Sequence, residues 1–493
     1  MGYLIGVILG TLLVVLITRL WSFLVYVIWR PYAITKKFRE QGIMGPAYKL
    51  WSGSIKEIIS IRRASEGVVL DINSHDITPR VLPHYTKWIS LYGRTFLYWF
   101  GPQPRICVTD PEQTKQVLSN KFGFYIKPEP NPIIFALMGK GLVFSEGSDW
   151  ARHRRVVNPA FAMDKLKMMT KTIAKCVQSM IEGWQIQDES QEKEIEFGRQ
   201  FQELTADVIS HTAFGSSYKE GKEVFLAQKE LQKLALATFF NIHLPIFRYI
   251  PTSRNLHKWK LERKARNTLM RIIQSRFDSK ESGYGNDLLG LMLEACTSGH
   301  YGGKKEDQRM NMDEIIDESK PRMAREAQEE VLRECGKEIP DADMLSKLRL
   351  VTMVLFEALR LYGPVVMMHR KADKDMNLGT LQIPKGTAVT LPLVIMHRDK
   401  EIWGADANEF NPFRFENGIT KAAKHPNALL AFSIGPRACI GQNFAMLEAK
   451  IVLAMILQRF SFRVSPNYKH APADLLTLQP KNGLPIILSP LNA

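Results

Sequence analysis

The chain has 493 residues, of which 45% are hydrophobic and 24% are charged. This composition is typical of globular proteins, and a chain of this length can bury a large core without disulfides or metals. A disordered, fibrous or small disulfide-rich protein is therefore excluded. Lys and Arg number 66 against 50 Asp and Glu, and the resulting net charge of +16 is typical of proteins that bind nucleic acid, an anionic membrane surface or an acidic partner.

Residues 3–29 form an apolar run that is longer than the ~20 residues needed to cross a bilayer. Trp21 and Trp29 suit the interface between lipid and water, whereas Arg19 either snorkels or marks an early end of the span. A signal peptide is the alternative, but the run is too long for one and no small-residue cleavage site follows it. The run therefore predicts a single transmembrane helix.

The residues that follow this run are basic, and only the amino terminus precedes it. They include Arg30, Lys36, Lys37 and Arg39. Because positive charge stays on the cytosolic side, we expect the rest of the chain to face the cytosol, which makes nucleic acid a poor explanation of the net charge. The predicted organisation is an anchor at residues 1–29, a linker that is basic and rich in Gly and Pro at residues 30–54, and one large domain at residues 55–493.

Five cysteines are scattered over the chain, and none lies in a Cys-x-x-Cys pair that would indicate zinc. They are Cys107, Cys176, Cys296, Cys335 and Cys439. So few cysteines in so long a chain predict no disulfide framework, and we expect reduced thiols on the cytosolic side.

Helical periodicity dominates from residue 111 to residue 360, where apolar residues recur three and four positions apart. Short alternating segments at residues 376–393 predict strands and turns, and residues 478–488 predict a closing hairpin. The basic stretch at residues 254–271 is interpreted as the solvated face of a helix. The pattern predicts a mainly α fold with small β-sheets, an α+β architecture.

The sharpest local signal is the ten-residue segment from Phe432 to Gly441, which places Cys439 just before a predicted amphipathic helix. Free amides at a helix start stabilise a thiolate, Gly435 permits a tight turn, and Arg437 offers a fixed cation. The alternative is a buried structural cysteine, the commonest fate of a lone cysteine. The complete segment favours a ligand. The apolar face of the predicted helix comprises Phe444, Leu447, Ile451, Ala454 and Leu457.

This segment resembles the cysteine-ligand loop of the cytochrome P-450 superfamily, the haem-thiolate monooxygenases, at every signature position. The resemblance covers nearly the whole chain and implies a P-450-like fold with an N-terminal transmembrane helix, in which the Cys439 thiolate holds the iron of haem b. By the same resemblance, a set of residues contacts the cofactor, with the cations neutralising its propionates. These residues are Trp150, Arg154, Arg370, Phe432, Gly435, Arg437, Cys439 and Gly441.

Glu357 and Arg360 resemble the helical Glu-x-x-Arg of that superfamily, and Arg414 lies in a segment similar to the one that completes its salt-bridge cluster. In isolation, Glu357 and Arg360 are three residues apart on one helix face and could form a surface ion pair of little energetic value. With Arg414, the resemblance implies a buried cluster that fixes the cysteine loop.

The function implied by the resemblance is hydroxylation of a hydrophobic small molecule with O2 and with electrons passed from NADPH by a flavoprotein reductase. Arg30-Pro31-Tyr32 and Gln41-Gly42-Ile43 look like a plant microsomal clan of hydroxylases that modify terpenoids and hormones. The implied location is the endoplasmic reticulum membrane, with a single span and a catalytic domain facing the cytosol. The substrate pocket would draw on residues 122–144, 365–368 and 478–484, which are mostly apolar.

One family element is missing from the sequence. Between Leu288 and Glu357 there is no match to the distal helix motif, Ala/Gly-Gly-x-Asp/Glu-Thr, that delivers protons to bound oxygen, so no catalytic residue is identified. Residues 312–318 resemble the start of that helix and residues 327–331 the end of the next. Residues 319–328, with a helix-breaking Pro321, stand where the family needs on the order of thirty more residues, or ~45 Å of helix. A splice variant or a faulty gene model would both give this pattern.

Two alternatives follow from the missing motif. Some relatives rearrange hydroperoxides without the usual threonine, although they keep a complete distal helix. The other alternative is a non-catalytic or misfolded variant that lacks the oxygen-activation helix.

Overall fold

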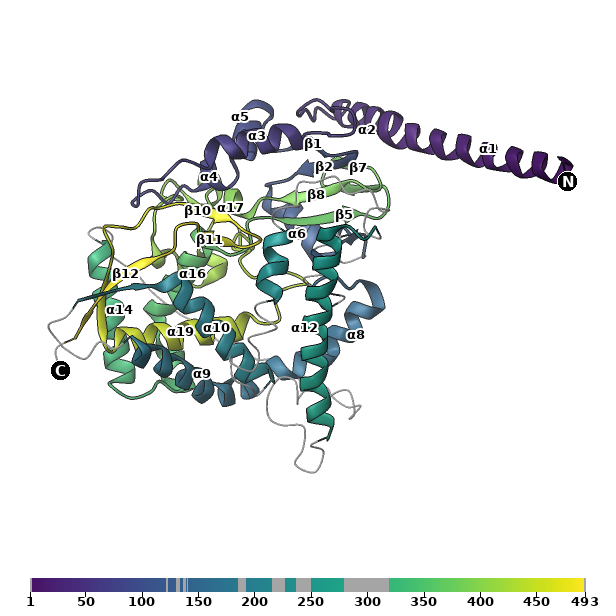
Figure 1. Ribbon diagram of the computed structural model, residues 1–493. Helices are drawn as coiled ribbons and strands as arrows, with labels where there is room; N and C mark the ends of the chain where they lie inside the picture. The colour runs from purple at the N-terminus through teal and green to yellow at the C-terminus, as the bar shows by residue number, and fades with distance from the viewer. Residues whose placement is uncertain are drawn as a thin grey trace.

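The computed structural model describes residues 2–120, 123–129, 134–135, 139, 141–184, 192–214, 227–235, 250–278 and 319–491. A long N-terminal helix projects from a body of helices and small sheets (Figure 1). The predicted mainly α architecture with small sheets is confirmed.

The helices of the N-terminal half are α1 (Gly2–Leu24), α2 (Arg30–Arg39), α3 (Ile55–Ser65), α4 (Thr78–Val81), α5 (Pro83–Tyr92), α6 (Pro111–Ser119), α8 (Gly147–Val157), α9 (Met163–Gly183) and α10 (Phe197–Phe214). Those of the C-terminal half are α12 (Ser253–Asp278), α14 (Ser319–Cys335), α15 (Ala342–Lys347), α16 (Arg349–Tyr362), α17 (Leu393–Met396), α18 (Lys400–Trp403) and α19 (Gln442–Leu457). A π-helical turn, η1 (Val25–Trp29), joins α1 to α2, and 3-10 turns are η2 (Asn158–Phe161), η5 (Pro412–Phe415) and η6 (Ile419–Lys421).

The strands are β1 (Phe96–Phe100), β2 (Gln103–Cys107), β3 (Tyr125–Ile126), β4 (Lys193–Glu196), β5 (Met368–Ala372), β6 (Met376–Leu378), β7 (Leu381–Ile383), β8 (Ala388–Leu391), β9 (Phe460–Val464), β10 (Pro472–Asp474), β11 (Leu478–Pro480) and β12 (Pro485–Pro490). The largest sheet has the order β1-β2-β8-β5-β3, with β2 and β8 parallel and the other pairs antiparallel. It lies beside α2, at the end of the body from which α1 leaves (Figure 1).

The N-terminal helix is long and apolar enough to cross a membrane. Its first element, α1, has 23 residues and no buried side chain, and so extends about 35 Å at 1.5 Å per residue. The hydroxyls of Thr11, Thr18 and Ser22 donate to backbone carbonyls one turn earlier, which satisfies these polar groups within the helix. Such internal pairing is what a polar side chain requires in lipid.

The segment predicted as a linker begins with a packed helix. Ile34 and Phe38 of α2 are 5% and 0% exposed and belong to the apolar cluster of the large sheet. The Gln41 side chain accepts a hydrogen bond from the Gln382 amide and donates one to the Gln382 carbonyl. The described chain therefore passes from the apolar helix into the core without a free spacer, because the composition of a segment does not reveal which of its side chains pack.

Among the described residues, the largest cluster of buried apolar side chains lies among α9, α10, α14, α16 and α19, together with β9 and β12. The helix predicted after the cysteine segment is α19, and its Ile451, Ala454 and Leu457 are buried as expected. Pro321 does not break a helix, because α14 begins at Ser319 and places the proline in the first turn, where no partner for its missing N–H is needed.

The closing hairpin predicted at residues 478–488 is wrong. β11 pairs with β10, whereas β12 pairs with β4 and β9 in another sheet. The chain turns at Gly483, which has a φ of +76°, and the Glu196 carboxylate accepts a hydrogen bond from the amide of Leu484. The partner that redirects β12 is thus nearly 300 positions earlier in the sequence. The strands predicted at residues 376–393 are confirmed, with β6 and β7 forming a hairpin.

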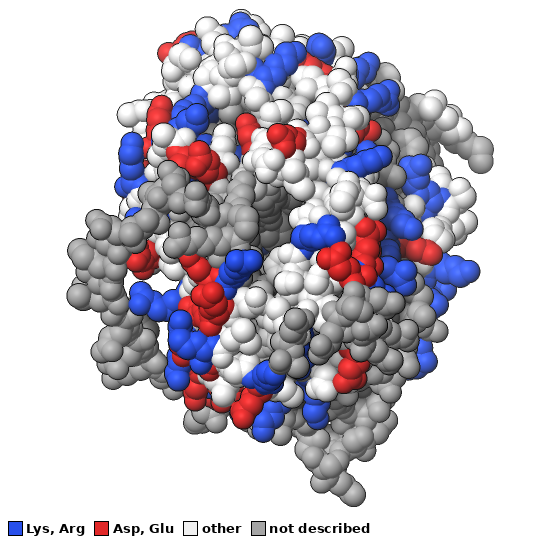
Figure 2. Space-filling view, turned by 90° about the vertical axis from the view of Figure 1, so that its left-hand side faces the viewer, with Lys and Arg blue, Asp and Glu red and all other residues white. Residues whose placement is uncertain are grey.

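The basic charge is dispersed on the face shown in Figure 2, where Lys and Arg side chains alternate with Asp and Glu. The basic stretch at residues 254–271 lies on α12, and most of its described cations are exposed, as the solvated-face interpretation requires. Lys258 is the exception, at 8% exposure.

The packing of α2 makes a prediction about stability. Phe38→Ala should lower the free energy of unfolding by about 3–5 kcal/mol, because it removes a fully buried aromatic side chain. Tyr32→Ala, on the same helix but 61% exposed, should change it by about 0.5 kcal/mol or less. Denaturant unfolding of the detergent-solubilised chain measures both, and two equally small effects would instead favour a free linker.

Candidate functional site

The cysteine loop runs from Phe432 to the start of α19 and is folded back on itself. The Cys439 amide donates to the Phe432 carbonyl at 2.8 Å, and Gly441 lies immediately before α19. Gly435 has a φ of +75°, and a Cβ there would lie 2.5 Å from the Leu118 carbonyl oxygen at the end of α6. Only glycine permits this approach. The loop is thereby seated against the sheet-side core at one end and continues into the helical core at the other.

The Cys439 thiol is exposed at the N-terminal end of α19, whereas Cys107, Cys176 and Cys335 are buried. All four are free, and Cys296 lies outside the described residues. A Cβ on Gly441 would lie 4.0 Å from the Cys439 sulfur, so the missing side chain keeps the space beside the sulfur open.

Two cations, one in the loop itself and one on α8, join the loop to its surroundings. Arg437 forms a 2.6 Å ion pair with Glu146, donates to the Ser145 carbonyl at 2.8 Å, and lies 4.3 Å from the centre of the Trp150 ring. Arg154, one helical turn after Trp150 on α8, donates to the Ala438 carbonyl at 2.9 Å. α8 thus holds the loop through both residues that the sequence predicted at this helix.

The cations repel one another. Burial, followed by the charges of Arg370 and Arg437, lowers the pKa of Lys127 to about 8. Burial and the charge of Arg437 lower the pKa of Arg370 to about 10. Glu146 is the one carboxylate among the described residues that offsets these shifts. The site therefore favours a ligand that carries more than one negative charge.

The structure brings the predicted residues Trp150, Arg154 and Arg437 together at the loop, and the charge of Arg437 acts on Arg370. The sequence analysis missed Lys127 and Glu146. Lys127 lies within the stretch that was assigned to the substrate pocket, and no local pattern marks either residue as part of this site.

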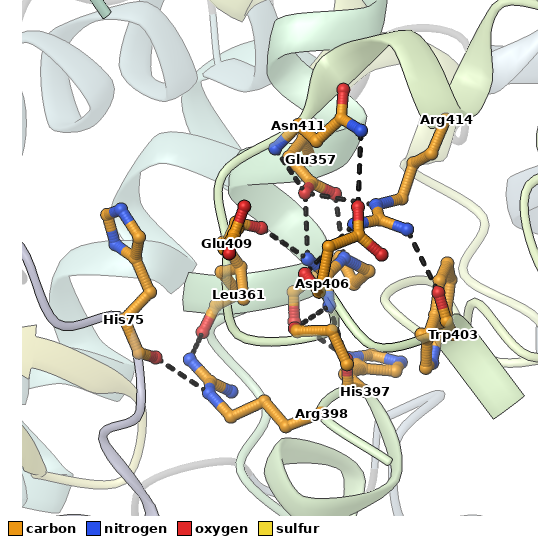
Figure 3. Close-up of polar contacts among 12 residues, drawn as sticks. His75, Glu357, Leu361, His397, Arg398, Trp403, Asp406, Glu409, Asn411 and Arg414 are labelled. Carbon is orange, nitrogen blue, oxygen red and sulfur yellow. Dashed lines mark hydrogen bonds and ion pairs between the residues drawn. The ribbon is translucent and has the colours of Figure 1, made fainter. Parts of the chain in front are cut away.

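Glu357, Arg360 and Arg414 form a buried ion cluster (Figure 3). Arg360 donates to both carboxylate oxygens of Glu357 at 2.7 Å, and both side chains are 0% exposed. Arg414 donates to Glu357 at 3.2 Å and to Asp406 at 2.7 Å. Arg360 also donates to three backbone carbonyls, those of His397, Ala407 and Glu409. The geometry is that of a buried cluster rather than of a surface pair.

His397, which the sequence analysis did not select, connects this cluster to the cysteine loop. Its Nε2 accepts from the Leu430 amide at 3.0 Å, so its Nδ1 carries the proton and donates to the Arg360 carbonyl at 3.0 Å. Leu430 lies two residues before Phe432. Burial, with the nearby charges of Arg360 and Arg398, lowers the pKa of His397 to about 3, which keeps the ring neutral.

An exposed sulfur at a helix start, a glycine that leaves space beside it and an excess of cations around it form a coherent donor set. Sulfur ligation of iron and neutralisation of two carboxylates are what a haem requires. The residues present therefore fit a haem-thiolate site, the class of site that the cysteine segment predicted.

Comparison with known proteins identifies the family. The sequence model described as Cytochrome P450 matches residues 79–320 and 318–486. Cytochrome P450 709B1 of Arabidopsis thaliana is 46% identical over 523 residues, with 100% of each chain covered. Cytochrome P450 709B3 (48%, 97% of each chain) and Cytochrome P450 734A1 (40%, 93% of this chain and 92% of the relative), both of Arabidopsis thaliana, are also similar. The chain belongs to the cytochrome P450 family of haem-thiolate monooxygenases, and the predicted resemblance to plant members is confirmed.

The family match is interrupted. It falls into two pieces that meet at residues 318–320, inside the region where the sequence lacks the distal helix motif. The alignment with Cytochrome P450 709B1 is 523 positions long, 30 more than the 493 residues of this chain. That relative therefore has about thirty residues without a counterpart here.

The neutral state of His397 makes stability depend on pH. The unfolded ring binds a proton below its ordinary pKa of 6.5, whereas the folded ring does so only near 3. Unfolding therefore takes up a proton between these values, and the free energy of unfolding should fall by up to about 1.4 kcal/mol per pH unit for this group as the pH decreases.

In His397→Asn, the free energy of unfolding should change less steeply with pH, because this variant takes up one proton fewer on unfolding. Denaturant unfolding between about pH 5 and pH 7 measures the slope. His84→Asn is a parallel test, because burial also lowers the pKa of His84 to about 3. This substitution should reduce the slope of the free energy of unfolding against pH by a similar amount. An unchanged slope in His397→Asn would show that the folded ring is already protonated.

Proposed function

We propose that this chain is built to hold haem b through the Cys439 thiolate as a single-pass protein of the endoplasmic reticulum membrane, with its domain on the cytosolic side. The observation that carries the proposal is the exposed Cys439 at the start of α19, in the same loop as Arg437, whose charge acts on both Arg370 and Lys127. The intact function would be hydroxylation of a hydrophobic small molecule with O2 and with electrons from NADPH through a flavoprotein reductase.

When bound, the haem supplies the redox centre at which the family activates oxygen. The chain's own residues position it. Cys439 would hold the iron from the start of α19, and Arg154 fixes the loop by donating to the Ala438 carbonyl. Arg370, Arg437 and Lys127 would neutralise the propionates, while Trp150 orients the Arg437 guanidinium.

The cysteine assignment is tested by substitution. In a form of the chain that also carries the additional residues of the 709B1 relative, Cys439→Ser should abolish the thiolate band in the carbon monoxide difference spectrum of the reduced protein, because an alcohol does not replace the thiolate. Cys335→Ser, at a buried cysteine in the helical core, is the control and should keep that band. A Cys439→Ser protein that still shows the band would mean that another group holds the iron.

We further propose that the segment missing near residues 319–328 removes the distal wall of the active site. Two observations support this, the interruption of the family match at residues 318–320 and the thirty unmatched positions of the 709B1 relative. The proton-delivery residues would be lost with that segment. These observations also favour the second candidate function, a non-catalytic variant, over a hydroperoxide-rearranging enzyme, which would keep the helix.

The energetic consequence of such a deletion is large. Each buried apolar side chain that is lost costs ~2–5 kcal/mol, and several together exceed the ~5–15 kcal/mol that stabilises a typical domain. Without proton delivery, reduced oxygen should leave as peroxide rather than enter the substrate. The chain as it stands should therefore be poorly folded or inactive.

A direct comparison tests this. The 493-residue chain and a form that carries the thirty additional residues of the relative are purified with a reductase and NADPH, and product is measured from a panel of hydrophobic substrates. The longer form should turn over substrate, while the short form should release peroxide or fail to retain haem. Comparable coupled turnover by the short form would contradict the proposal.

A further inference from the structure

A cavity of about 520 Å³ lies where the N-terminal helix meets the large sheet, on the far side of that sheet from the cysteine loop's cations. Arg370 and Lys371 are successive residues of β5, and successive strand residues point to opposite faces of a sheet. Arg370 acts electrostatically on Arg437, whereas Lys371 lines the cavity. The cavity is therefore separate from the candidate haem site.

The floor of the cavity is built by the pairing of three strands. Ala388 of β8 is the register partner of both Arg105 on β2 and Lys371 on β5. All three residues line the cavity. A row with alanine in the centre and a long cation on each side leaves a depression whose two walls carry positive charge.

The membrane helix supplies a third cation. Arg30, the first residue of α2, donates to the Lys385 carbonyl and stands 5.7 Å from the centre of the Tyr26 ring. Gly386 makes this approach possible, because it has a φ of +78° and a Cβ there would lie 2.5 Å from an Arg30 nitrogen. Lys385, on the same turn, is the fourth cation of the lining.

These cations lack anionic partners among the described residues. None of Arg30, Arg105, Lys371 and Lys385 forms an ion pair within the described parts of the chain. The Nε atom of Arg105 is buried and has no hydrogen-bond partner there, although the guanidinium stacks 4.1 Å from the Phe100 ring. A buried donor without an acceptor is costly, so this atom points to an anionic ligand.

Size and polarity narrow the class of ligand. Two carboxylates, Glu129 and Asp373, line the cavity with the four cations. Carboxylates repel a bare phosphate but accept hydrogen bonds from hydroxyl groups. A volume of about 520 Å³ also exceeds what a phosphate alone needs. A ring with several hydroxyls and at least one phosphate satisfies both kinds of side chain.

The position of the cavity identifies the source of such a ligand. Tyr26 and Arg30 both line it and stand at the end of the apolar helix, where the chain would leave the hydrocarbon region. Lipid headgroups occupy this level. We propose that the cavity binds the phosphorylated inositol headgroup of an anionic membrane lipid.

The full-length chain in detergent tests the proposal without haem or turnover. Native mass spectrometry counts lipids bound from titrations with phosphatidylinositol 4-phosphate, phosphatidylserine and phosphatidic acid of the same acyl chains. The phosphoinositide should bind most tightly. Arg105→Gln with Lys371→Gln should weaken its binding by about 25-fold, since each basic residue at an anionic lipid surface contributes a roughly fivefold gain.

Two further variants separate the cavity from general charge. Ala388→Leu keeps every cation but fills the floor, and should also remove the preference for the phosphoinositide. Lys36→Gln with Lys37→Gln removes two exposed α2 cations outside the cavity lining and should retain the preference. An unchanged far-ultraviolet circular dichroism spectrum verifies that each variant is folded.

Several results would overturn the proposal. Equal binding of the phosphoinositide and phosphatidylserine would leave only general electrostatics. Equal binding of phosphatidic acid would remove the role of the inositol ring. If soluble inositol 1,4-bisphosphate binds and the phosphoinositide does not displace it, the ligand of the cavity is not a lipid. A control variant that loses as much affinity as the cavity variants would place the site elsewhere on α2.

Discussion

The bidentate ion pair between Arg360 and Glu357 is the interaction on which the position of the cysteine loop depends. Both side chains are fully buried. Removing one partner of such a pair costs about 3–5 kcal/mol of stability, because the remaining charge is left buried without a partner and away from water. The remaining hydrogen bonds of Arg360 go to the backbone carbonyls of His397, Ala407 and Glu409. His397 then connects the Arg360 carbonyl to the Leu430 amide, so the cluster supports the chain immediately before the cysteine loop.

The large sheet separates two groups of cations, one on each of its faces. One face contributes Arg370 to the cations around the cysteine loop, and the other contributes Lys371 to the cavity beneath the membrane helix. The period of two along β5 allows adjacent cations to serve separate ligands. Because α2 packs its Phe38 into the same sheet, the membrane helix, the proposed lipid cavity and the proposed haem site share one rigid support.

Local patterns in the sequence predicted the parts of the site that are contiguous. The cysteine segment, the helix α19 and the three-residue spacing of Glu357 and Arg360 are all visible in short windows. His397, Lys127 and Glu146 escaped prediction because their partners are distant in sequence and no motif surrounds them. The hairpin at residues 478–488 was wrong for the same reason, since β4 pairs with β12 from nearly 300 positions earlier, and the role of α2 depended on packing that composition does not reveal.

The claim that the buried cluster positions the cysteine loop can be measured by hydrogen exchange of the full-length chain. In Glu357→Gln, amides of residues 430–441 should exchange faster, including the Cys439 amide that is bonded to Phe432, while peptides from β1 and β2 should keep their protection. That result would show that the loop depends on the cluster and not only on overall stability. Faster exchange at residues 397–414 with unchanged exchange at residues 430–441 would contradict the account.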